Sequence, residues 1–460
     1  MVVKTQDARV DVAALTQRKV FRRLMPILML GYIAGYLDRT SISFASQGLN
    51  QEFGMNATAF GFAVGIFFLG YVLFEVPSNI LLHRVGARIW ITRIMISWGI
   101  VTVLIGFTTG AAGVYVLRFL LGIAEAGFFP GIILYLTYWF PNAVRARMLS
   151  IFMLSVSVAL ATGSLLNGQI LEHFNGLLGF SGWRWIFFIG GILAVILGVL
   201  SFFLLTDSPQ KARWLNDNER QWLVDTLARE NEERAEGRPN HGVLAGLRDK
   251  RVILLAMVFF LIQFGNYPLA FWLPQLVKKI GPDLSAVQVS LVTAIPYACA
   301  ATVLFLMAMR FARRGAEVAH ISVPLVLASG AFAVITTALG QPIIALIAIT
   351  VATMCVLPAT AMFWSLPTHY LTGAAAASGI ALINSVGNIA GFTSPYSYGI
   401  LRDATGSDNV ALATLGAAVI TAATILILWR NRTRPKLAKP SNAGPGPERT
   451  GATAFKDPVS

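Results

Sequence analysis

The chain has 460 residues, of which 56% are hydrophobic and 13% charged, and its mean hydropathy is +0.66. A soluble fold of this length has too little interior to bury so much apolar surface, so the composition predicts a protein whose main solvent is lipid. The net charge of +14 does not indicate a nucleic-acid partner, because the basic residues cluster at the ends of apolar runs and on no polar domain.

Twelve apolar segments are long enough to cross a bilayer as helices, which takes about 20 residues each. Six precede the only long polar stretch inside the chain and six follow it, which predicts an all-α membrane protein built from two six-helix halves. In chain order the expected spans are 22–45, 57–82, 89–109, 112–139, 146–171, 184–205, 252–277, 286–309, 319–340, 342–368, 375–401 and 409–430.

The polar segments complete the expected domain organisation. A basic tail, 1–21, precedes the first bundle, 22–205, and a central loop with one surface helix, 206–251, leads to the second bundle, 252–430. The apolar run after the tail is too long for a signal peptide and lacks a cleavage signature, so the first span is expected to be retained. The C-terminal tail, 431–460, is rich in Pro, Gly and basic residues and is expected to be disordered.

The placement of the 36 Lys and Arg residues predicts the orientation of the spans. Most of them gather in the two tails, the central loop and alternate short loops. The few at the opposite ends of the spans are Arg184, Lys278, Lys279 and Arg402. The positive-inside rule then places both termini in the cytoplasm of a multi-pass protein, which we expect in a bacterial inner membrane.

Charged groups inside spans are the strongest functional signal, because each costs several kcal/mol unless it meets a partner or a water-filled cavity. There are five, all in the first half: Asp38, Arg39, Glu75, Arg118 and Glu125. With a rise of about 1.5 Å per residue, Asp38 lies about 22 Å along the first span, while Arg118 and Glu125 lie about 9 and 20 Å along the oppositely directed fourth span. Arg118 and Glu125 share a helix face. Two cations and two carboxylates are therefore expected to converge on one cavity.

The chemistry of these groups predicts their roles. A guanidinium grips a carboxylate through two parallel hydrogen bonds and stays charged, which assigns Arg39 to an anionic cargo. A buried carboxyl group near a cation can gain and lose a proton as its exposure changes, which assigns Asp38 and Glu125 to proton coupling. Arg118 is expected to pair with either acid in the empty site. The alternative is a set of fixed ion pairs between the spans, and for Glu75 a structural role is favoured.

These charges lie in stretches that resemble the anion:cation symporter family of the major facilitator superfamily. The resemblance runs from about Arg22 to Arg430 and is closest to the tartrate, phthalate and hydroxyphenylacetate permease branch. The matching stretches are Tyr36 to Arg39, Phe74 to Asn79, Arg84 to Arg88, Arg118 to Gly131, Phe363 to Pro367 and Ala381 to Asn388.

The resemblance implies the twelve-helix fold of that superfamily and proton-coupled symport, by alternating access, of a small organic carboxylate such as tartrate, phthalate, hydroxyphenylacetate or a sugar acid. It implies coupling by Asp38, Arg118 and Glu125. For Asn384 and Asn388, packing between helices is as good an explanation as cargo binding. The implied cargo-binding residues are Tyr36, Arg39, Tyr71, Ser365 and Asn388, and the groups that could complete the pocket are Asn266, Tyr267, Thr368 and Asn384.

Two positions depart from the family's pattern in the loops that close the inner gate. His83 and Ala312 stand where an acidic residue is usual, which leaves the strength of that gate open.

Other functions fit the sequence less well. A membrane enzyme needs a nucleophile with a base or a metal motif, and Cys299 and Cys355 lie in apolar stretches without ligand spacing. A channel has no use for coupled acids and bases in one half. An exchanger or uniporter of the same fold remains the alternative. We expect a monomer in the bilayer with no cofactor or metal, and with the proton as coupling ion.

Overall fold

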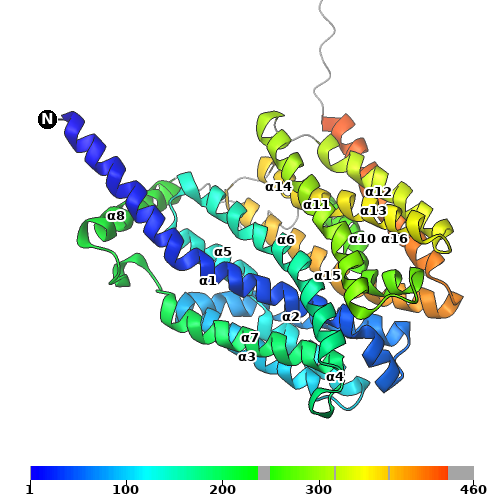
Figure 1. Cartoon of the computed structure of the whole chain (residues 1–460). Coiled ribbons are helices and arrows are strands. Elements are labelled where there is room, and N and C mark those ends of the chain that lie inside the picture. Colours follow the sequence, from blue (N-terminus) through cyan, green and yellow to red (C-terminus); the bar gives the residue numbers. More distant parts are fainter. Residues whose placement is uncertain (1, 237–248, 315–317, 371–372, 434–460) are drawn as a thin grey trace, which may run out of the picture.

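The computed structural model describes residues 2–236, 249–314, 318–370 and 373–433, which are helices and connecting turns without a strand. Two bundles lie side by side, the first coloured blue to green and the second yellow-green to orange (Figure 1). The first bundle contains α1 (Val2–Phe53), α2 (Ala57–Val85), α3 (Ala87–Gly106), α4 (Ala111–Glu125), α5 (Phe128–Trp139), α6 (Asn142–His173) and α7 (Gly182–Leu204). The second contains α10 (Lys250–Ile280), α11 (Ala286–Arg314), α12 (Ala319–Ala338), α13 (Pro342–Phe363), α14 (Ser365–Tyr370), α15 (Gly373–Thr405) and α16 (Asp408–Thr433).

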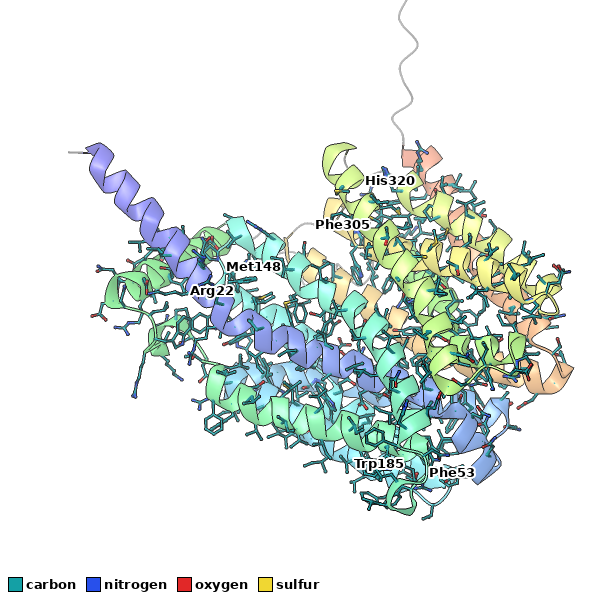
Figure 2. All side chains as sticks on the ribbon, in the orientation of Figure 1. Arg22, Phe53, Met148, Trp185, Phe305 and His320 are labelled. Carbon is teal, nitrogen blue, oxygen red and sulfur yellow. The ribbon has the colours of Figure 1, made fainter. Side chains whose placement is uncertain are left out.

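The prediction of an all-α membrane protein is confirmed. Eleven segments of the described chain are long and apolar enough to cross a membrane. The remaining expected span, 375–401, is the long helix α15, which packs along α2 and α10. Large apolar side chains cover the outer faces of the bundles, as Phe305 does on α11 with 61% of its surface exposed (Figure 2), because lipid solvates these faces.

Two expected spans are not continuous helices. The segment 112–139 is divided between α4 and α5 at Gly127, whose φ of 84° suits a glycine and ends the first helix. The segment 342–368 is divided between α13 and α14 at Trp364. Both interruptions lie inside the bundles, where neighbouring helices can satisfy the freed backbone groups.

The polar segments are partly helical. Residues 2–21 belong to α1, which begins as a helix at Val2. The central segment contains α8 (Asp217–Glu236). Two short helices flank α7: η1 (Leu177–Gly179) precedes it and η2 (Pro209–Lys211) follows it. Lys19 pairs with Glu219 of α8 at 2.5 Å, so the extended end of α1 has a polar partner. The expected C-terminal tail, 431–460, lies outside the described residues from position 434 onward.

The two bundles are tied together by helix caps at the end opposite the N-terminus. The carboxylate of Asp403, at the end of α15, accepts hydrogen bonds from the N–H groups of Ala57 and Thr58, which begin α2. The carboxylate of Glu172, at the end of α6, accepts one from the N–H of Val287 in the first turn of α11. Each carboxylate therefore caps a helix of the other half, where the positive end of the helix dipole favours an anion.

The α2–α15 contact is close enough to exclude side chains. A methyl group on Gly61 would lie 2.3 Å from the carbonyl oxygen of Pro395, so only glycine allows this approach. This same end carries Phe53 and Trp185, whereas Arg22 and His320 lie toward the other end (Figure 2). The bundles are thus closed against each other at the end remote from the N-terminus.

Candidate substrate and coupling site

The first feature of the site is an ion pair between α1 and α4. Arg39 contacts Oε1 of Glu125 through both Nη2, at 2.6 Å, and Nε, at 2.7 Å. Glu125 is 2% exposed, and its second oxygen, Oε2, has no hydrogen-bond partner in the described part of the chain. Glu125 is therefore buried but not fully satisfied, while 18% of the Arg39 side chain is exposed, and leaving a buried carboxylate in this state is costly in a purely structural contact.

The other two charges lie beside this pair. Asp38 is buried, and its Oδ2 accepts a 2.8 Å hydrogen bond from the Thr102 hydroxyl of α3. The fully buried Arg118 donates from Nε to the carbonyl oxygen of Ala63 at 3.2 Å, while its Nη1 and Nη2 have no partner among the described residues. The Arg39 and Arg118 guanidinium groups lie 5.4 and 5.0 Å from the centre of the Phe67 ring. The structure thus brings four of the five charged residues singled out in the sequence into one cluster.

The pairing within the cluster differs from the expectation. Arg118 was expected to pair with one of the acids when the site is empty, but the partner of Glu125 is Arg39. The Nε of Arg118 is turned instead to a backbone carbonyl of α2. The reason is geometric, because the rotation of α4 against α1 and α2 decides which cation reaches the acid. The residue assigned to the cargo is therefore already bound to a residue assigned to the proton.

Aromatic rings surround the Arg39 end of the cluster. Its guanidinium carbon lies 5.6 Å from the ring centre of Tyr36 and 5.0 Å from that of Tyr71. About one turn before Tyr71 on α2, Phe68 packs edge-on against Tyr267 of α10, with ring centres 4.7 Å apart. The rings of Tyr36 and Tyr71 attract the Arg39 cation and help to hold it. The Phe68–Tyr267 contact extends this aromatic layer to the second half.

Neutral polar groups of the second half face this layer. The hydroxyl of Tyr267 donates to Oδ1 of Asn388 at 3.3 Å. One turn earlier on α15, Asn384 donates to Oε1 of Glu75 on α2 at 3.1 Å, so this hydrogen bond joins the two halves. Glu75, for which the sequence favoured a structural role, is thus a buried contact across the interface.

The remaining predicted site residues have local partners or are not described. Asn266 donates to Gln263 on its own helix at 3.4 Å, and Ser365, at the start of α14, donates to the carbonyl oxygen of Met362 at 2.7 Å. Thr368 lies in α14, but its side chain is outside the described part of the structure. For the gate loops, the His83 ring lies 3.4 Å from the Tyr138 hydroxyl, and the side chain of Ala312 is not among those described.

Two polar residues were missed in the sequence. Thr102, the partner of Asp38, gave no signal because a single threonine within an apolar span usually bonds to its own helix. Asp408 is fully buried at the start of α16 and binds Lys279 at 2.6 Å and Arg402 at 3.3 Å. Its position just before an apolar run made it look like a solvated loop residue, although its burial depends on α10 and α15.

Unsatisfied charges buried inside one half of a helical multi-pass protein with two halves are typical of membrane transporters. The chain belongs to the Major Facilitator Superfamily, whose model matches residues 28–395. It is 44% identical over 435 residues to a protein of Agrobacterium vitis described as a candidate tartrate transporter, covering 94% of this chain and 95% of the relative. It is also 37% identical to a quinolone resistance transporter of Acinetobacter baumannii, with 88% and 92% covered.

Other relatives and solved structures agree with this family. The inner membrane transport protein RhmT of Escherichia coli is 34% identical, with 89% of this chain and 94% of the relative covered. The inward open structure of the xylose transporter XylE from E. coli superimposes with a TM-score of 0.73 at 15% identity, covering 89% of this chain and 96% of that one. The family and the fold point to a transporter and not to an enzyme.

Proposed function

We propose that this protein is a secondary active transporter that takes up a small organic carboxylate together with protons by alternating access. The observation that carries the proposal is the Arg39–Glu125 pair, whose buried carboxylate lies beside the buried Asp38 and Arg118. A guanidinium with a planar fork of donors is the side chain best suited to bind a carboxylate. Because Arg39 holds the carboxylate of Glu125, an anionic cargo competes with Glu125 for it.

This competition couples cargo to protons. When the cargo carboxylate takes the place of Glu125 on Arg39, the displaced Glu125 is left buried with less compensating charge. An uncompensated buried carboxylate costs several kcal/mol, so Glu125 takes up a proton when it is displaced. Cargo and proton therefore enter the site together, and both leave when the other end opens and Glu125 returns to Arg39. Asp38, held by Thr102, is the second carboxyl group able to exchange a proton.

Tartrate is the first cargo to test, because two relatives described as candidate tartrate transporters are each 44% identical to this chain. The rings of Tyr36 and Tyr71 lie beside the Arg39 guanidinium, and Tyr267 packs on the neighbouring Phe68, so rings and hydroxyl groups suit an aromatic acid such as phthalate or hydroxyphenylacetate as well as a hydroxy acid. We propose uptake across a bacterial inner membrane, with both termini in the cytoplasm as the positive-inside rule requires.

The experiment uses purified full-length protein in proteoliposomes. Tartrate accumulation is measured with an inwardly directed proton gradient, without one, and with the gradient plus an uncoupler. We expect accumulation above equilibrium only with the gradient. Tartrate uptake that is indifferent to the uncoupler would instead favour an exchanger or uniporter of the same fold. A thermal-shift screen of mono- and dicarboxylates then ranks the cargoes, and stabilisation by none of them would contradict the carboxylate assignment.

A further inference from the structure

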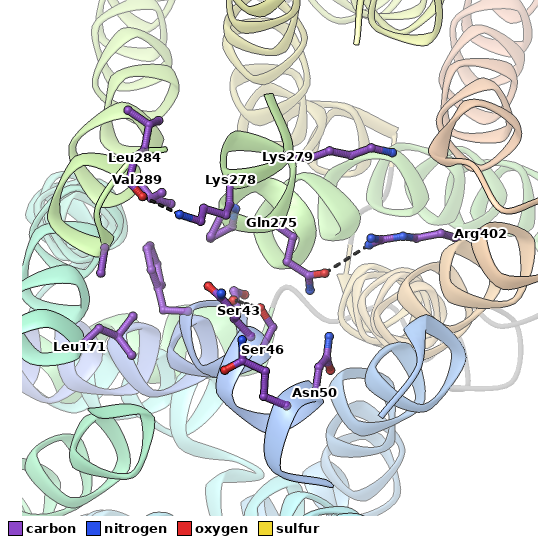
Figure 3. Close-up of a pocket in the computed structure, with 15 residues that line it drawn as sticks. Ser43, Ser46, Asn50, Leu171, Gln275, Lys278, Lys279, Leu284, Val289 and Arg402 are labelled. Carbon is purple, nitrogen blue, oxygen red and sulfur yellow. Dashed lines mark hydrogen bonds between the residues drawn. The ribbon is translucent and has the colours of Figure 1, made fainter. Parts of the chain in front are cut away.

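A polar cavity lies between the halves, at the end where the helix caps tie them together (Figure 3). Its volume is about 460 Å³, and residues of α1, α6, α10, α11 and α15 line it. Polar side chains of α1 form one wall. Three cations, Lys278, Lys279 and Arg402, come from the second half, and none of the described residues that line the cavity is acidic.

The cavity lies on the same two helices as the central cluster. Along α1, Ser43 is one turn beyond Arg39, a rise of about 6 Å. Along α10, Gln275 is two turns beyond Tyr267, a rise of about 12 Å. The Ser43 hydroxyl donates to the carbonyl oxygen of Ala270 at 3.3 Å, and this hydrogen bond joins α1 to α10. The cavity therefore lies along these two helices, farther from the N-terminal end of α1 than Arg39 is.

The positive charge of the cavity is only partly neutralised. Asp408 binds both Lys279 and Arg402 from outside the lining. Lys278 donates to the carbonyl oxygen of Leu284 at 2.6 Å, a neutral partner. The nearby carboxylates of Glu172 and Asp403 cap α11 and α2, and that of Asp283 lies in an exposed loop and does not line the cavity. The described lining thus has three cations against one directly bound carboxylate.

A neutral donor inside the cavity is also unsatisfied. Arg402 donates to Oε1 of Gln275 at 3.2 Å, which fixes the direction of the amide at the centre of the lining residues (Figure 3). The Nε2 of Gln275 is buried and has no hydrogen-bond partner in the described part of the chain. Leaving such a donor unpaired costs about 1–3 kcal/mol, so an anion that accepts from it gains more than charge attraction alone.

We propose that this cavity is an outer anion-binding site, which holds the carboxylate cargo between Lys278, Gln275 and Arg402 before it passes to Arg39. The inference rests on the proposed function and adds a second subsite to it. A cavity of one sign of charge raises the local concentration and the association rate of an oppositely charged ligand. Cargo bound there lies at the entrance that opens when the capped ends of the two halves move apart.

Two variants test this site without touching the central cluster. Gln275→Glu is nearly isosteric and places a carboxylate beside Arg402, and Lys278→Gln removes one cation. Lys211→Gln is the matched control, because this lysine is 70% exposed, lies in η2 and contacts no cavity residue. Melting temperatures of all three purified proteins exclude a folding defect, and if Gln275→Glu is unstable, Lys278→Gln alone carries the test.

The measurement is the initial rate of tartrate uptake into right-side-out proteoliposomes at several ionic strengths. We expect both cavity variants to raise the KM about fivefold at low salt, with an unchanged maximum rate and a weaker salt dependence, because steering is screened by ions. The Lys211→Gln protein should match the parent. A parental KM in both cavity variants would overturn the outer site while leaving tartrate transport intact, whereas absence of tartrate uptake by the parent would overturn the proposed function as well.

A second measurement separates this site from Arg39. Tartrate-dependent thermal stabilisation is compared in Arg39→Ala and in Arg39→Ala combined with Gln275→Glu. We expect a small remaining stabilisation in the first protein, at high tartrate concentration, and none in the second. Equal stabilisation in both would contradict the binding of tartrate by the cavity.

Discussion

The two halves of the molecule handle charge in different ways. In the first half, Arg39, Glu125, Asp38 and Arg118 form one cluster at the level where the halves meet. At the same level the second half contributes neutral groups, Tyr267, Asn384 and Asn388, and its buried carboxylate, Asp408, lies at the closed end. When one half rocks against the other, the charged cluster therefore moves as part of one half, and in the proposed cycle its Arg39–Glu125 pair opens only when cargo binds. Proton binding and cargo binding can then be coupled without breaking an ion pair across the moving interface.

The largest expected effect comes from removing the cation of the first half. Arg39→Ala should weaken tartrate binding at least about 100-fold, because a buried charge-assisted contact is worth on the order of 3 kcal/mol when one partner is deleted. Calorimetry on the purified protein measures this. The single variant also leaves Glu125 without its cation, so the double variant Arg39→Ala with Glu125→Gln is the control for the unpaired carboxylate. Parental tartrate affinity in the single or the double variant would remove Arg39 from the site.

The next largest effect concerns the proton. Glu125→Gln keeps a hydrogen-bonding side chain but cannot exchange a proton, so we expect gradient-driven accumulation to be lost while tartrate counterflow is retained. Both assays use the same proteoliposomes. Asp217→Asn, at a carboxylate that is 91% exposed on α8, should leave both assays unchanged. Accumulation at the parental level would show that Glu125 is not an obligatory proton carrier.

A smaller effect is expected at the interface between the halves. Asn384→Ala removes the donor of the buried Glu75, which should slow uptake about tenfold, since a hydrogen bond to a charged group is worth roughly 1.5–3 kcal/mol. The maximum rate is measured in proteoliposomes. Asn409→Ala, at an exposed position in the first turn of α16, is the matched control. An unchanged rate in the Asn384 variant would mean that the cross-interface hydrogen bond does not affect the transport cycle.

The smallest effect is expected at the closed end. Asp403→Asn keeps an acceptor for the first turn of α2 but loses its charge, which is worth about 0.3–1 kcal/mol at a helix N-terminus. We expect a two- to fivefold faster reaction of a cysteine placed at Ser46, in the outer cavity, with an impermeant maleimide. Asp249→Asn is the control, because Asp249 caps α10 within its own half. Equal acceleration by both substitutions would contradict a specific role of the cap between the halves.

Much of this molecule could be predicted from its sequence. A bilayer demands apolar helices of a set length, so the spans were visible as runs of hydropathy, and the five charges inside them stood out because lipid makes such residues rare. The helical repeat also predicted that Arg118 and Glu125 share a face. These features depend on local composition and spacing, which the linear sequence contains.

Contacts between helices were decided only by the tertiary structure. The partner of Glu125 is Arg39 and not Arg118, Glu75 reaches across to Asn384, and Asp408 pairs with Lys279 of α10, which lies far from it in the chain. The closed end likewise depends on carboxylates that cap helices of the opposite half. The sequence determined which side chains enter the membrane and at what depth, whereas the rotation and packing of the helices determined which of them meet, because a pairing requires two side chains to face the same point in space.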